Sequence, residues 1–154
     1  MRKIFIGVML LISMTGSSFA TWSSKYSMLT EYATRIADAI KVDIDEHTLT
    51  DGQIYTYLSS LVSYDNRIWS ATIGFSPEFF KNRENRQWWI SKQWQNNYKQ
   101  SRKELYAPYV WRNMDNLLTA ADIGDLTSNF GYDYTDTKWD WWHRTMESQK
   151  PTWS

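Results

Sequence analysis

The segment Ile68–Phe75 has the sequence IWSATIGF, whose alternation of apolar and small or polar residues is the clearest strand signal in the chain. The odd-numbered residues from Trp69 onward fall on one face of an extended segment, and the even-numbered residues fall on the other. The pattern predicts a half-buried strand that the Ser76-Pro77 pair ends. The domain is therefore expected to contain a sheet, and the flanking segments decide its class.

A long helix is predicted ahead of this strand. Apolar residues recur at helical spacing over Leu29–Ile40, and Ser23 or Ser24 is placed to cap a helix that runs to about Lys41. The acidic run 43–47 then reads as a polar break. It begins like a calcium-binding loop but lacks the required glycine and glutamate, so a solvated loop is the favoured interpretation.

Helix and strand signals then follow along the chain. Thr50 and Gln53 form a capping-box pattern that opens a second helix. Beyond the first strand, Tyr106–Arg112 predicts a second strand, Asn113–Asn116 a hairpin turn, and Leu117 onward a third strand. This mixture of elements predicts the α+β class.

Aromatic residues accumulate toward the C-terminus, where four of the ten tryptophans fall within the last sixteen residues. Asp136 or Thr137 is placed to cap a short helix that contains Trp141 and Trp142. Residues 152–154 then read as the first step of a further strand without a partner. So many rings either form an aromatic core or line a small-molecule pocket, and composition favours the core.

The stretch from Lys81 to Glu104 differs in kind, because it holds seven Lys or Arg residues against two Glu residues. Ile90, Trp94 and Tyr98 lie four residues apart, so a helix is expected. Basic residues interleaved with rings are found where proteins bind single-stranded nucleic acid or anionic membranes. The favoured alternative is a surface helix whose rings face the domain and whose charges face water.

The N-terminus reads as an export signal. Arg2 and Lys3 precede an apolar run over Ile4–Met14, and small residues stand at positions −3 and −1 of a peptidase site after Ala20. The run is shorter than the roughly 20 residues of a spanning helix, so cleavage is favoured over an uncleaved anchor. The product is expected to be periplasmic or extracellular, or else anchored in the inner membrane by residues 4–20.

The composition limits the remaining classes of function. The 154 residues, 42% hydrophobic and 17% aromatic, suffice for one packed domain. Basic and acidic residues balance at 17 against 17, and loss of the leader would leave 15 against 17, so no global attraction to nucleic acid is expected. The absence of cysteine excludes disulfides, thiolate metal sites and cysteine nucleophiles.

Four motifs stand in order along the chain: Ala71–Pro77 (ATIGFSP), Tyr106–Arg112 (YAPYVWR), Tyr132–Tyr134 (YDY), and Trp139–Trp142 (WDWW) followed by Lys150–Ser154 (KPTWS). Over about Tyr26 to Ser154, their order and spacing resemble the extracytoplasmic double Cache (PDC-type, PAS-like) sensor domains. These are the periplasmic parts of bacterial chemoreceptors, sensor kinases, cyclases and phosphatases.

The resemblance implies a long N-terminal helix that rises from the membrane and packs on a PAS-like antiparallel sheet with flanking helices. Residues 1–20 would then be the leader or anchor and residues 21–154 a partial sensor domain, with the basic aromatic stretch at about 81–105 as an insertion. The family pattern continues past Ser154 into a further strand, a membrane-proximal half and a second membrane span. The sheet is therefore expected to be incomplete at its C-terminus.

The resemblance also implies a small-molecule site walled by the central strands and the C-terminal rings. Carried over by position, the candidate ligand-binding residues are Tyr109, Trp111, Arg112, Tyr132, Tyr134, Trp139, Asp140, Trp141 and Trp142. Tyr109 and Trp111 are expected to share a strand face. Arg112 and Asp140 would be polar anchors or each other's ion-pair partners. Amino-acid-binding members carry an arginine where this chain has Trp139, so an amino-acid ligand is in doubt.

The sequence holds no catalytic constellation. His143, Asp136 and Asp140 are metal-capable groups near one helix start, but a capping aspartate and a surface histidine are the favoured interpretation. Asp133 and Asp136 are an acidic pair of the kind a glycoside hydrolase uses. No phosphate-binding glycine loop, nucleophile elbow or zinc-protease motif is present, so no enzyme activity, metal or cofactor is expected.

The expected function is extracytoplasmic sensing of a small-molecule ligand, as the sensor part of a truncated bacterial signal-transduction receptor without a transmitter module. The alternative is a free secreted aromatic-rich protein that binds a carbohydrate or another flat ligand. The expected partners are a small molecule, the membrane through an uncleaved N-terminal segment, and a second copy through the N-terminal helix. No nucleic-acid partner is expected.

Overall fold

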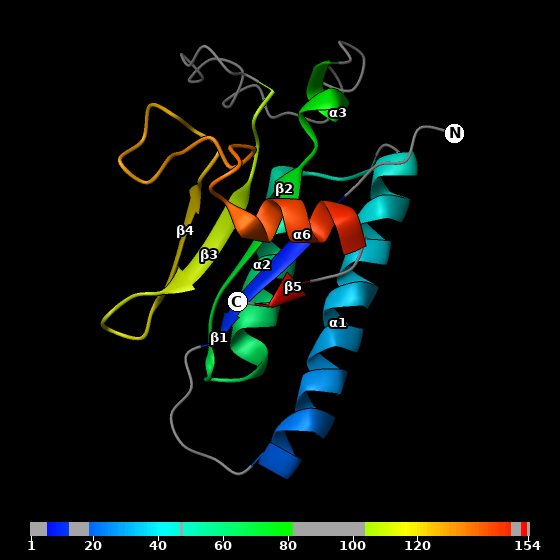
Figure 1. The fold of residues 1–154 in the computed structure, drawn as a ribbon, viewed down its shortest axis with the longest axis vertical. Helices are drawn as coiled ribbons and strands as arrows, with labels where there is room; N and C mark the ends of the chain where they lie inside the picture. Colours follow the sequence, from blue (N-terminus) through cyan, green and yellow to red (C-terminus); the bar gives the residue numbers. More distant parts are fainter. Residues whose placement is uncertain (1–5, 13–18, 47, 82–103, 149–151, 154) are drawn as a thin grey trace.

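The computed structural model of the chain describes residues 6–12, 19–46, 48–81, 104–148 and 152–153 (Figure 1). The elements are β1 (Ile6–Ile12), α1 (Phe19–Asp45), α2 (Asp51–Tyr64), β2 (Ile68–Phe75), α3 (Pro77–Lys81), β3 (Pro108–Arg112), β4 (Leu118–Asp122), α6 (Asp140–Ser148) and β5 (Thr152–Trp153). The chain is an α+β protein, as predicted. The helix predicted within the basic aromatic stretch lies outside the described residues.

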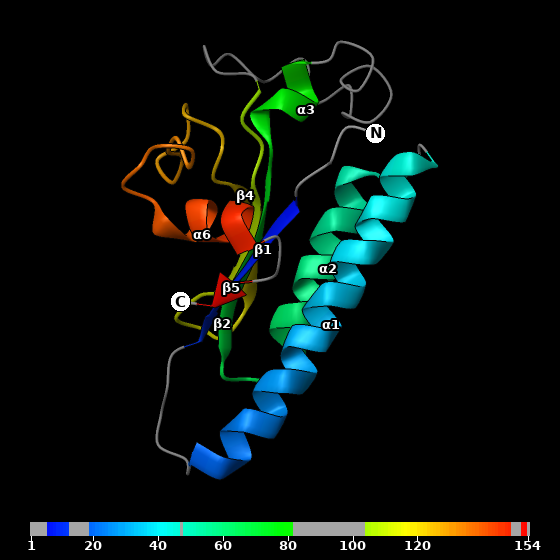
Figure 2. The same cartoon turned by 45° about the vertical axis from the view of Figure 1, so that its right-hand side comes forward.

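One sheet separates two layers of helix. Its strand order is β4-β3-β2-β1-β5. Neighbouring strands from β4 to β1 are antiparallel, and β5 is parallel to β1. Figure 2 shows α1 and α2 together on one side of the sheet and α6 on the other. The sheet therefore has a helix-pair face, covered by α1 and α2, and a ring face, crossed by α6.

β2 is buried on both faces, so the prediction of a half-buried strand with Trp69 on its inner face was wrong. A bulge in the pairing with β1 explains why Trp69 is exposed. Leu11 pairs with Ser70 but Ile12 pairs with Ile68, which leaves Trp69 as the extra residue. Trp69 is accordingly 43% exposed, whereas the other residues of β2 are buried. The face expected to meet water is the one that α6 covers.

α1 is longer at both ends than predicted. It begins before the caps predicted at Ser23 or Ser24, because serine is tolerated inside a helix and its capping preference is a weak constraint. At the other end, the acidic run predicted as a polar break is helical through Asp45. Ile44 extends the buried stripe, and the carboxylate of Asp43 accepts a hydrogen bond of 3.1 Å from the hydroxyl of Tyr57 on α2.

The predicted capping box of α2 is confirmed: Gln53 N donates to the hydroxyl of Thr50, and Thr50 N donates to the Gln53 side chain over 2.7 Å.

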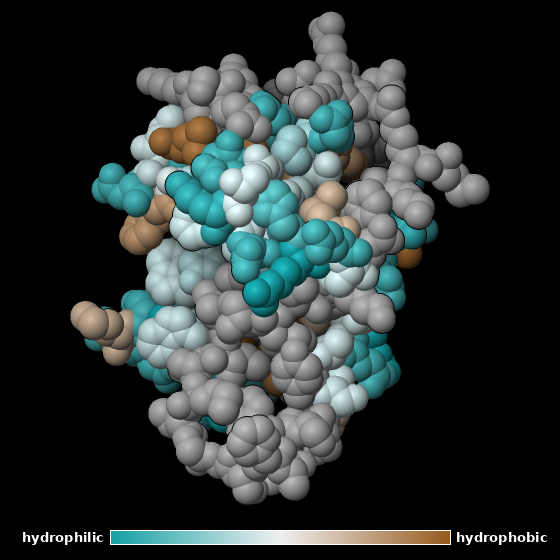
Figure 3. All heavy atoms as spheres, in the orientation of Figure 1, coloured by the Kyte–Doolittle hydropathy of each residue, from teal (hydrophilic) through white to brown (hydrophobic). Residues whose placement is uncertain are grey.

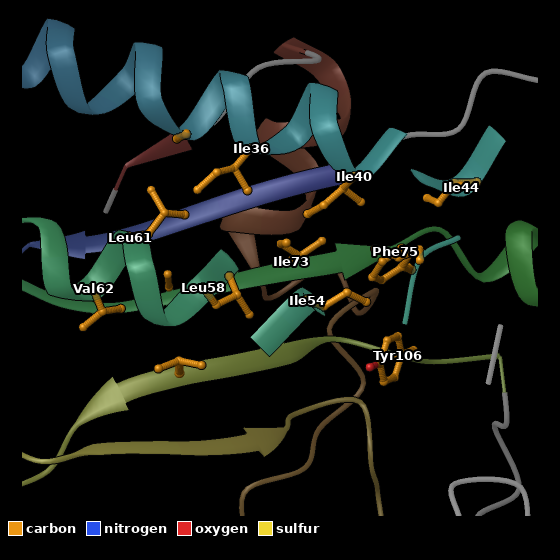
Figure 4. Close-up of a cluster of buried hydrophobic side chains, with 14 of the residues drawn as sticks. Ile36, Ile40, Ile44, Ile54, Leu58, Leu61, Val62, Ile73, Phe75 and Tyr106 are labelled. Atoms are coloured by element: carbon orange, nitrogen blue, oxygen red, sulfur yellow. The ribbon is translucent and has the colours of Figure 1, made fainter. Parts of the chain in front are cut away.

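The core beneath the helix pair is mainly aliphatic (Figure 4). Many residues here have no exposed surface: Ala33, Ile40, Ile54, Leu58, Leu61, Val62, Ile68, Ala71, Ile73 and Phe75. Burial of these side chains is the main stabilising contribution on this face.

The predicted hairpin between β3 and β4 is confirmed. The side chain of Asn113 accepts hydrogen bonds from the backbone N–H groups of Asp115 and Leu117, over 3.0 and 2.9 Å. Asn116 adopts a positive φ of 62°, a conformation that asparagine tolerates better than most residues.

The segment predicted as the apolar part of an export leader forms β1, an inner strand of the sheet. The peptidase site predicted after Ala20 falls within the first turn of α1. β5, predicted to have no partner, pairs with β1 at Met9 and Leu10. Cleavage of the leader stays a prediction, and the structure describes where this segment lies in the intact chain.

Among the described residues, no helix combines the length and the apolar character that crossing a membrane requires.

Candidate functional site

A second buried cluster, rich in aromatic side chains, lies on the ring face of the sheet. We call it the ring cluster. Its residues come from the segment that leads into β3, β3 itself, the loops after β4, and α6: Leu105, Ala107, Tyr109, Ile123, Leu126, Tyr132, Tyr134, Trp139, Trp141, Trp142 and Met146. Six of the nine predicted ligand-binding residues contribute partly or fully buried rings to this cluster: Tyr109, Tyr132, Tyr134, Trp139, Trp141 and Trp142.

Glycine in β2 lets α6 lie close to the sheet. A Cβ atom added at Gly74 would lie 2.8 Å from Cζ3 of Trp142 and 3.0 Å from Cη2 of Trp141. The two indole rings meet edge to face, with centroids 6.0 Å apart and planes at 80°. In Figure 3 the outer side of α6 is hydrophilic, which agrees with its exposed charged residues. The helix is therefore held by its two buried tryptophans.

From within the ring cluster, Tyr134 links the end of β2 to the segment before β3. Its hydroxyl donates to the carbonyl of Phe75 at the end of β2 over 2.6 Å. The same oxygen accepts from the backbone N–H of Tyr106 over 3.1 Å. The side chain has no exposed surface, and its ring contacts Trp141 and Trp142. Tyr134 was predicted as a ligand contact, and its polar group is committed to the backbone.

Tyr109 and Trp111 lie side by side on the ring face of β3. Their rings stack with centroids 5.1 Å apart and planes at 18°, so the prediction that they share a face is confirmed. The ring of Phe130 contacts that of Trp111, with centroids 5.7 Å apart, and Phe130 is 64% exposed. Sequence reasoning missed Phe130, because it lies in an irregular loop where no periodicity marks a face.

Three buried polar atoms on the ring face have no hydrogen-bond partner within the described part of the chain. They are Nε1 of Trp139, Nε1 of Trp141 and Oγ of Ser70. Ser70 pairs with Trp111 across the ladder, so it lies on this face. A buried donor without an acceptor costs about 1–3 kcal/mol, so native proteins rarely keep one without a reason.

The indole N–H of Trp141 faces the phenol of Tyr132. Burial raises the pKa of Tyr132, the Trp141 indole opposes that shift in part, and Tyr109 adds to it. The Trp141 N–H still completes no hydrogen bond of ordinary geometry. Trp139 packs on the other side of Tyr132, with ring centroids 4.1 Å apart. Two phenols and two indole N–H groups thus belong to one buried cluster beside the N-terminal end of α6.

The two charged residues predicted as polar anchors do not meet. Arg112 donates to the carbonyl of Val62 at the end of α2 over 2.7 Å, on the helix-pair face of the sheet. Asp140 pairs with Arg144 over 3.0 Å on the exposed side of α6. The predicted ion pair between Arg112 and Asp140 is therefore wrong. The two side chains lie apart because side chains alternate along a strand, so the residue after Trp111 points to the opposite face of the sheet from Trp111.

The acidic residues before α6 stabilise backbone turns through their side chains. Asp136 accepts from the backbone N–H of Lys138 over 3.1 Å, and Asp133 accepts from that of Thr135 over 3.0 Å. Nε2 of His143 lies 3.3 Å from the carbonyl oxygen of Asp136. Within the described ranges, no group of three or more histidine, cysteine or acidic residues is placed to hold a metal ion.

Comparisons of the chain with protein-family models, with curated proteins and with solved structures find no match. The resemblance to Cache domains therefore rests on the motifs in the sequence. Any statement about function has to be argued from the ring cluster and the sheet that carries it.

Proposed function

We propose that this chain is the ligand-sensing part of an extracytoplasmic receptor domain of the double Cache type, with a PAS-like sheet and without enzyme activity. The observation that carries the proposal is the pair of buried indole N–H groups on Trp139 and Trp141, which complete no hydrogen bond of ordinary geometry among the described residues, although that of Trp141 faces the Tyr132 phenol. They lie beside Tyr109 and Tyr132, on the face of the sheet away from the long N-terminal helix. A ligand bound there would supply the missing acceptor.

The contrast with the opposite face supports this assignment. The helix-pair face is filled mainly by aliphatic side chains, and the polar groups at its edge, such as Arg112 and Tyr57, have partners. On the ring face, aromatic side chains combine stacking surfaces with donors. Small-molecule sites are typically lined by aromatic and apolar side chains with a few convergent polar groups.

The ligand that fits this chemistry is flat, uncharged and rich in hydrogen-bond acceptors. Two described cations adjoin the ring cluster, and each pairs with an acidic side chain. Lys138 lies 5.4 Å from the ring centroid of Trp139 and 3.8 Å from a carboxylate oxygen of Asp136. Arg144 pairs with Asp140, so a ligand carboxylate would find no bidentate clamp among them.

Thermal unfolding of the full chain with a panel of uncharged heterocycles, amino acids and sugars tests the proposal. A ligand at 100 times its Kd stabilises the folded state by about 2.7 kcal/mol, so the midpoint must rise. Trp141→Phe keeps a ring but removes the N–H donor, and we expect the ligand-dependent rise to disappear. Trp69→Phe is the matched control, because Trp69 is exposed at the bulge and outside the ring cluster.

Two results would contradict the proposal. One is a panel in which no compound class raises the midpoint of a chain that unfolds cooperatively. The other is a compound whose effect survives both Trp141→Phe and Trp139→Phe, because that compound binds without the unpaired indole donors.

A free secreted carbohydrate-binding protein is the second candidate function. The observation that favours it is the exposed ring of Phe130 against Trp111, since an open aromatic platform suits a sugar ring. The two functions separate by mutation. Phe130→Ala should abolish sugar binding and leave binding at Trp141 intact, whereas Trp141→Phe should do the reverse.

The setting of the domain is part of the proposal. It is exported, periplasmic or extracellular, or anchored by its N-terminal segment, and its partners are a small molecule and a second copy through α1. Met28 and Val42 are exposed on α1 and lie fourteen residues apart, which puts them on the same side of the helix. Sedimentation of the full chain with and without Val42→Glu would test the dimer.

A further inference from the structure

One inner strand of the sheet, β1, comes from the N-terminal end of the chain. β1 lies between β2 and β5, and it is followed by residues 13–18 and then by α1 (Figure 1). Its sequence, IGVMLLI, carries no charge and lies wholly within the predicted leader. If that leader is removed, an inner position of the sheet loses its strand.

The pairing shows how much depends on β1. It pairs antiparallel with β2 from Ile6 opposite Phe75 to Ile12 opposite Ile68, which is the full length of β2. β5 joins the sheet through Met9 and Leu10 alone among the described pairings. Without β1, the inner edge of β2 would present unpaired backbone N–H and C=O groups, and β5 would have no neighbour in the described sheet.

The strand that would lose its neighbour, β2, is buried along its length except at Trp69. Ser70, Ala71, Thr72, Ile73 and Phe75 have no exposed surface while β1 is in place. On the other edge, Ser70, Ala71 and Thr72 pair with β3, and the backbone N–H of Phe75 donates to the carbonyl of Tyr106 over 3.0 Å. An open edge on such a strand binds extended peptide, because the main chain supplies hydrogen bonds and the neighbouring helices supply apolar contact.

We propose that the gap between β2 and β5 is a strand-binding slot, and that its occupant is this chain's own segment Ile6–Ile12. In the intact chain the segment completes the sheet. After a cut between β1 and α1, the same segment stays in the slot as a separate peptide. The ligand class is an uncharged, extended apolar strand that runs antiparallel to β2 and parallel to β5.

A nicked full-length chain gives the direct test. A protease site is placed in residues 13–18, the folded protein is cut, and the products are separated by gel filtration without denaturant. The N-terminal fragment should elute with the remainder in equal amounts. Met9→Pro should release it, because a proline at an inner strand position removes a donor and distorts the ladder. Arg2→Pro, outside the strand, is the matched control and should leave the fragment bound.

A peptide experiment approaches the slot from the other side. A labelled peptide of residues 4–14 with terminal lysines for solubility is added in excess to the nicked full-length chain and to the uncut chain. We expect it to exchange with the N-terminal fragment of the nicked chain and to leave the uncut chain, whose slot is filled, unlabelled. The proline-substituted peptide should have no effect.

Three outcomes would overturn the proposal. They are release of the fragment from the nicked wild-type chain, equal retention of the Met9→Pro fragment, and an equal unfolding midpoint and denaturant dependence of chains with and without residues 1–20. None of these outcomes is a ligand-binding measurement, so failure of this proposal and failure of the proposed ligand site can be distinguished.

Discussion

The two faces of the sheet are covered by different chemistry. Beneath α1 and α2 the side chains are mostly aliphatic, and the polar groups at the margin bond to the backbone or to each other. Beneath α6 the side chains are mostly aromatic, and the described unpaired buried polar atoms lie on this side. Both faces exclude water from the same strand, β2.

The difference separates stability from recognition. Aliphatic side chains fill space and offer no donor, so the helix-pair face has little to give a polar ligand. Tyrosine and tryptophan rings carry a polar group at one end. If that group is buried without a partner, a ligand that supplies the partner gains the free energy of the missing hydrogen bond. Changes on the two faces are therefore expected to affect different measurements.

Leu58→Ala should give the largest loss of stability. Leu58 on α2 has no exposed surface in the aliphatic core, and truncation of such a leucine costs about 2–5 kcal/mol. Urea unfolding of the full chain measures the loss, and ligand-dependent changes in tryptophan fluorescence should persist at a temperature where the variant is folded. A loss below about 1 kcal/mol would show that the helix-pair face is not the stabilising one.

Tyr134→Phe tests the polar junction inside the ring cluster. The change removes the hydroxyl that bonds to Phe75 O and Tyr106 N, and two buried hydrogen bonds are lost together. We expect a loss of about 1–3 kcal/mol in urea unfolding. Tyr132→Phe is the matched control in the same cluster on a half-buried ring, with an expected loss below about 1 kcal/mol. Equal losses would show that the hydroxyl of Tyr134 has no special role.

Gly74→Ala tests how α6 sits on the sheet. The added methyl group would meet the Trp142 ring at 2.8 Å, so α6 must shift. Inserting a methyl group into a filled core costs about 1–3 kcal/mol. Gly52→Ala is the control, because nothing lies within 4 Å of its Cβ position and alanine favours helix. Near-ultraviolet circular dichroism should change for Gly74→Ala alone, and an unchanged spectrum would contradict the close docking.

Local patterns were enough to predict much of the helix-pair face. The capping box at Thr50, the apolar stripe from Leu29 to Ile40 and the turn at Asn113 each need only neighbours in sequence, and each is confirmed. The α+β class follows from the same signals. Physical terms of short range, such as capping and periodic burial, decide these features.

The ring face was predicted less well, because its geometry depends on contacts between distant segments. The bulge at Trp69 comes from pairing with β1, which no pattern in IWSATIGF reveals. The role of Gly74 depends on α6, nearly seventy residues away along the chain. The face on which Arg112 lies could have been predicted, since strand alternation already places Arg112 on the face opposite Trp111.

Alkaline pH should weaken the folded state through the buried tyrosines. Burial is the largest cause that raises the pKa of Tyr106, and burial likewise raises the pKa of Tyr55; Asp51 and Asp122 add to both shifts. Because the folded-state pKa values lie above the ordinary value of about 10, the stabilisation is fully present below that pH and is lost as the pH rises further. Each such tyrosine contributes up to about 1.4 kcal/mol per pH unit above pH 10.

Urea unfolding between pH 8 and pH 11 measures this effect. Tyr106→Phe should reduce the alkaline slope, whereas Tyr132→Phe on the ring face should reduce it less, since the Trp141 indole partly offsets the raised pKa of Tyr132. A wild-type stability that stays level up to pH 11 would contradict the burial of these phenols.

Asp140→Asn should give the smallest effect. Asp140 and Arg144 form an i,i+4 pair on α6, and both side chains are mostly exposed. Such pairs contribute about 0.3–0.5 kcal/mol and are screened by salt. Since Trp141 and Trp142 hold α6 through buried contacts, removal of the pair should leave the ligand-induced rise in midpoint unchanged. If Asp140→Asn abolished that rise while Asp140→Glu restored it, Asp140 would be a ligand anchor, and the ring face would owe its binding to a charge instead of its indole donors.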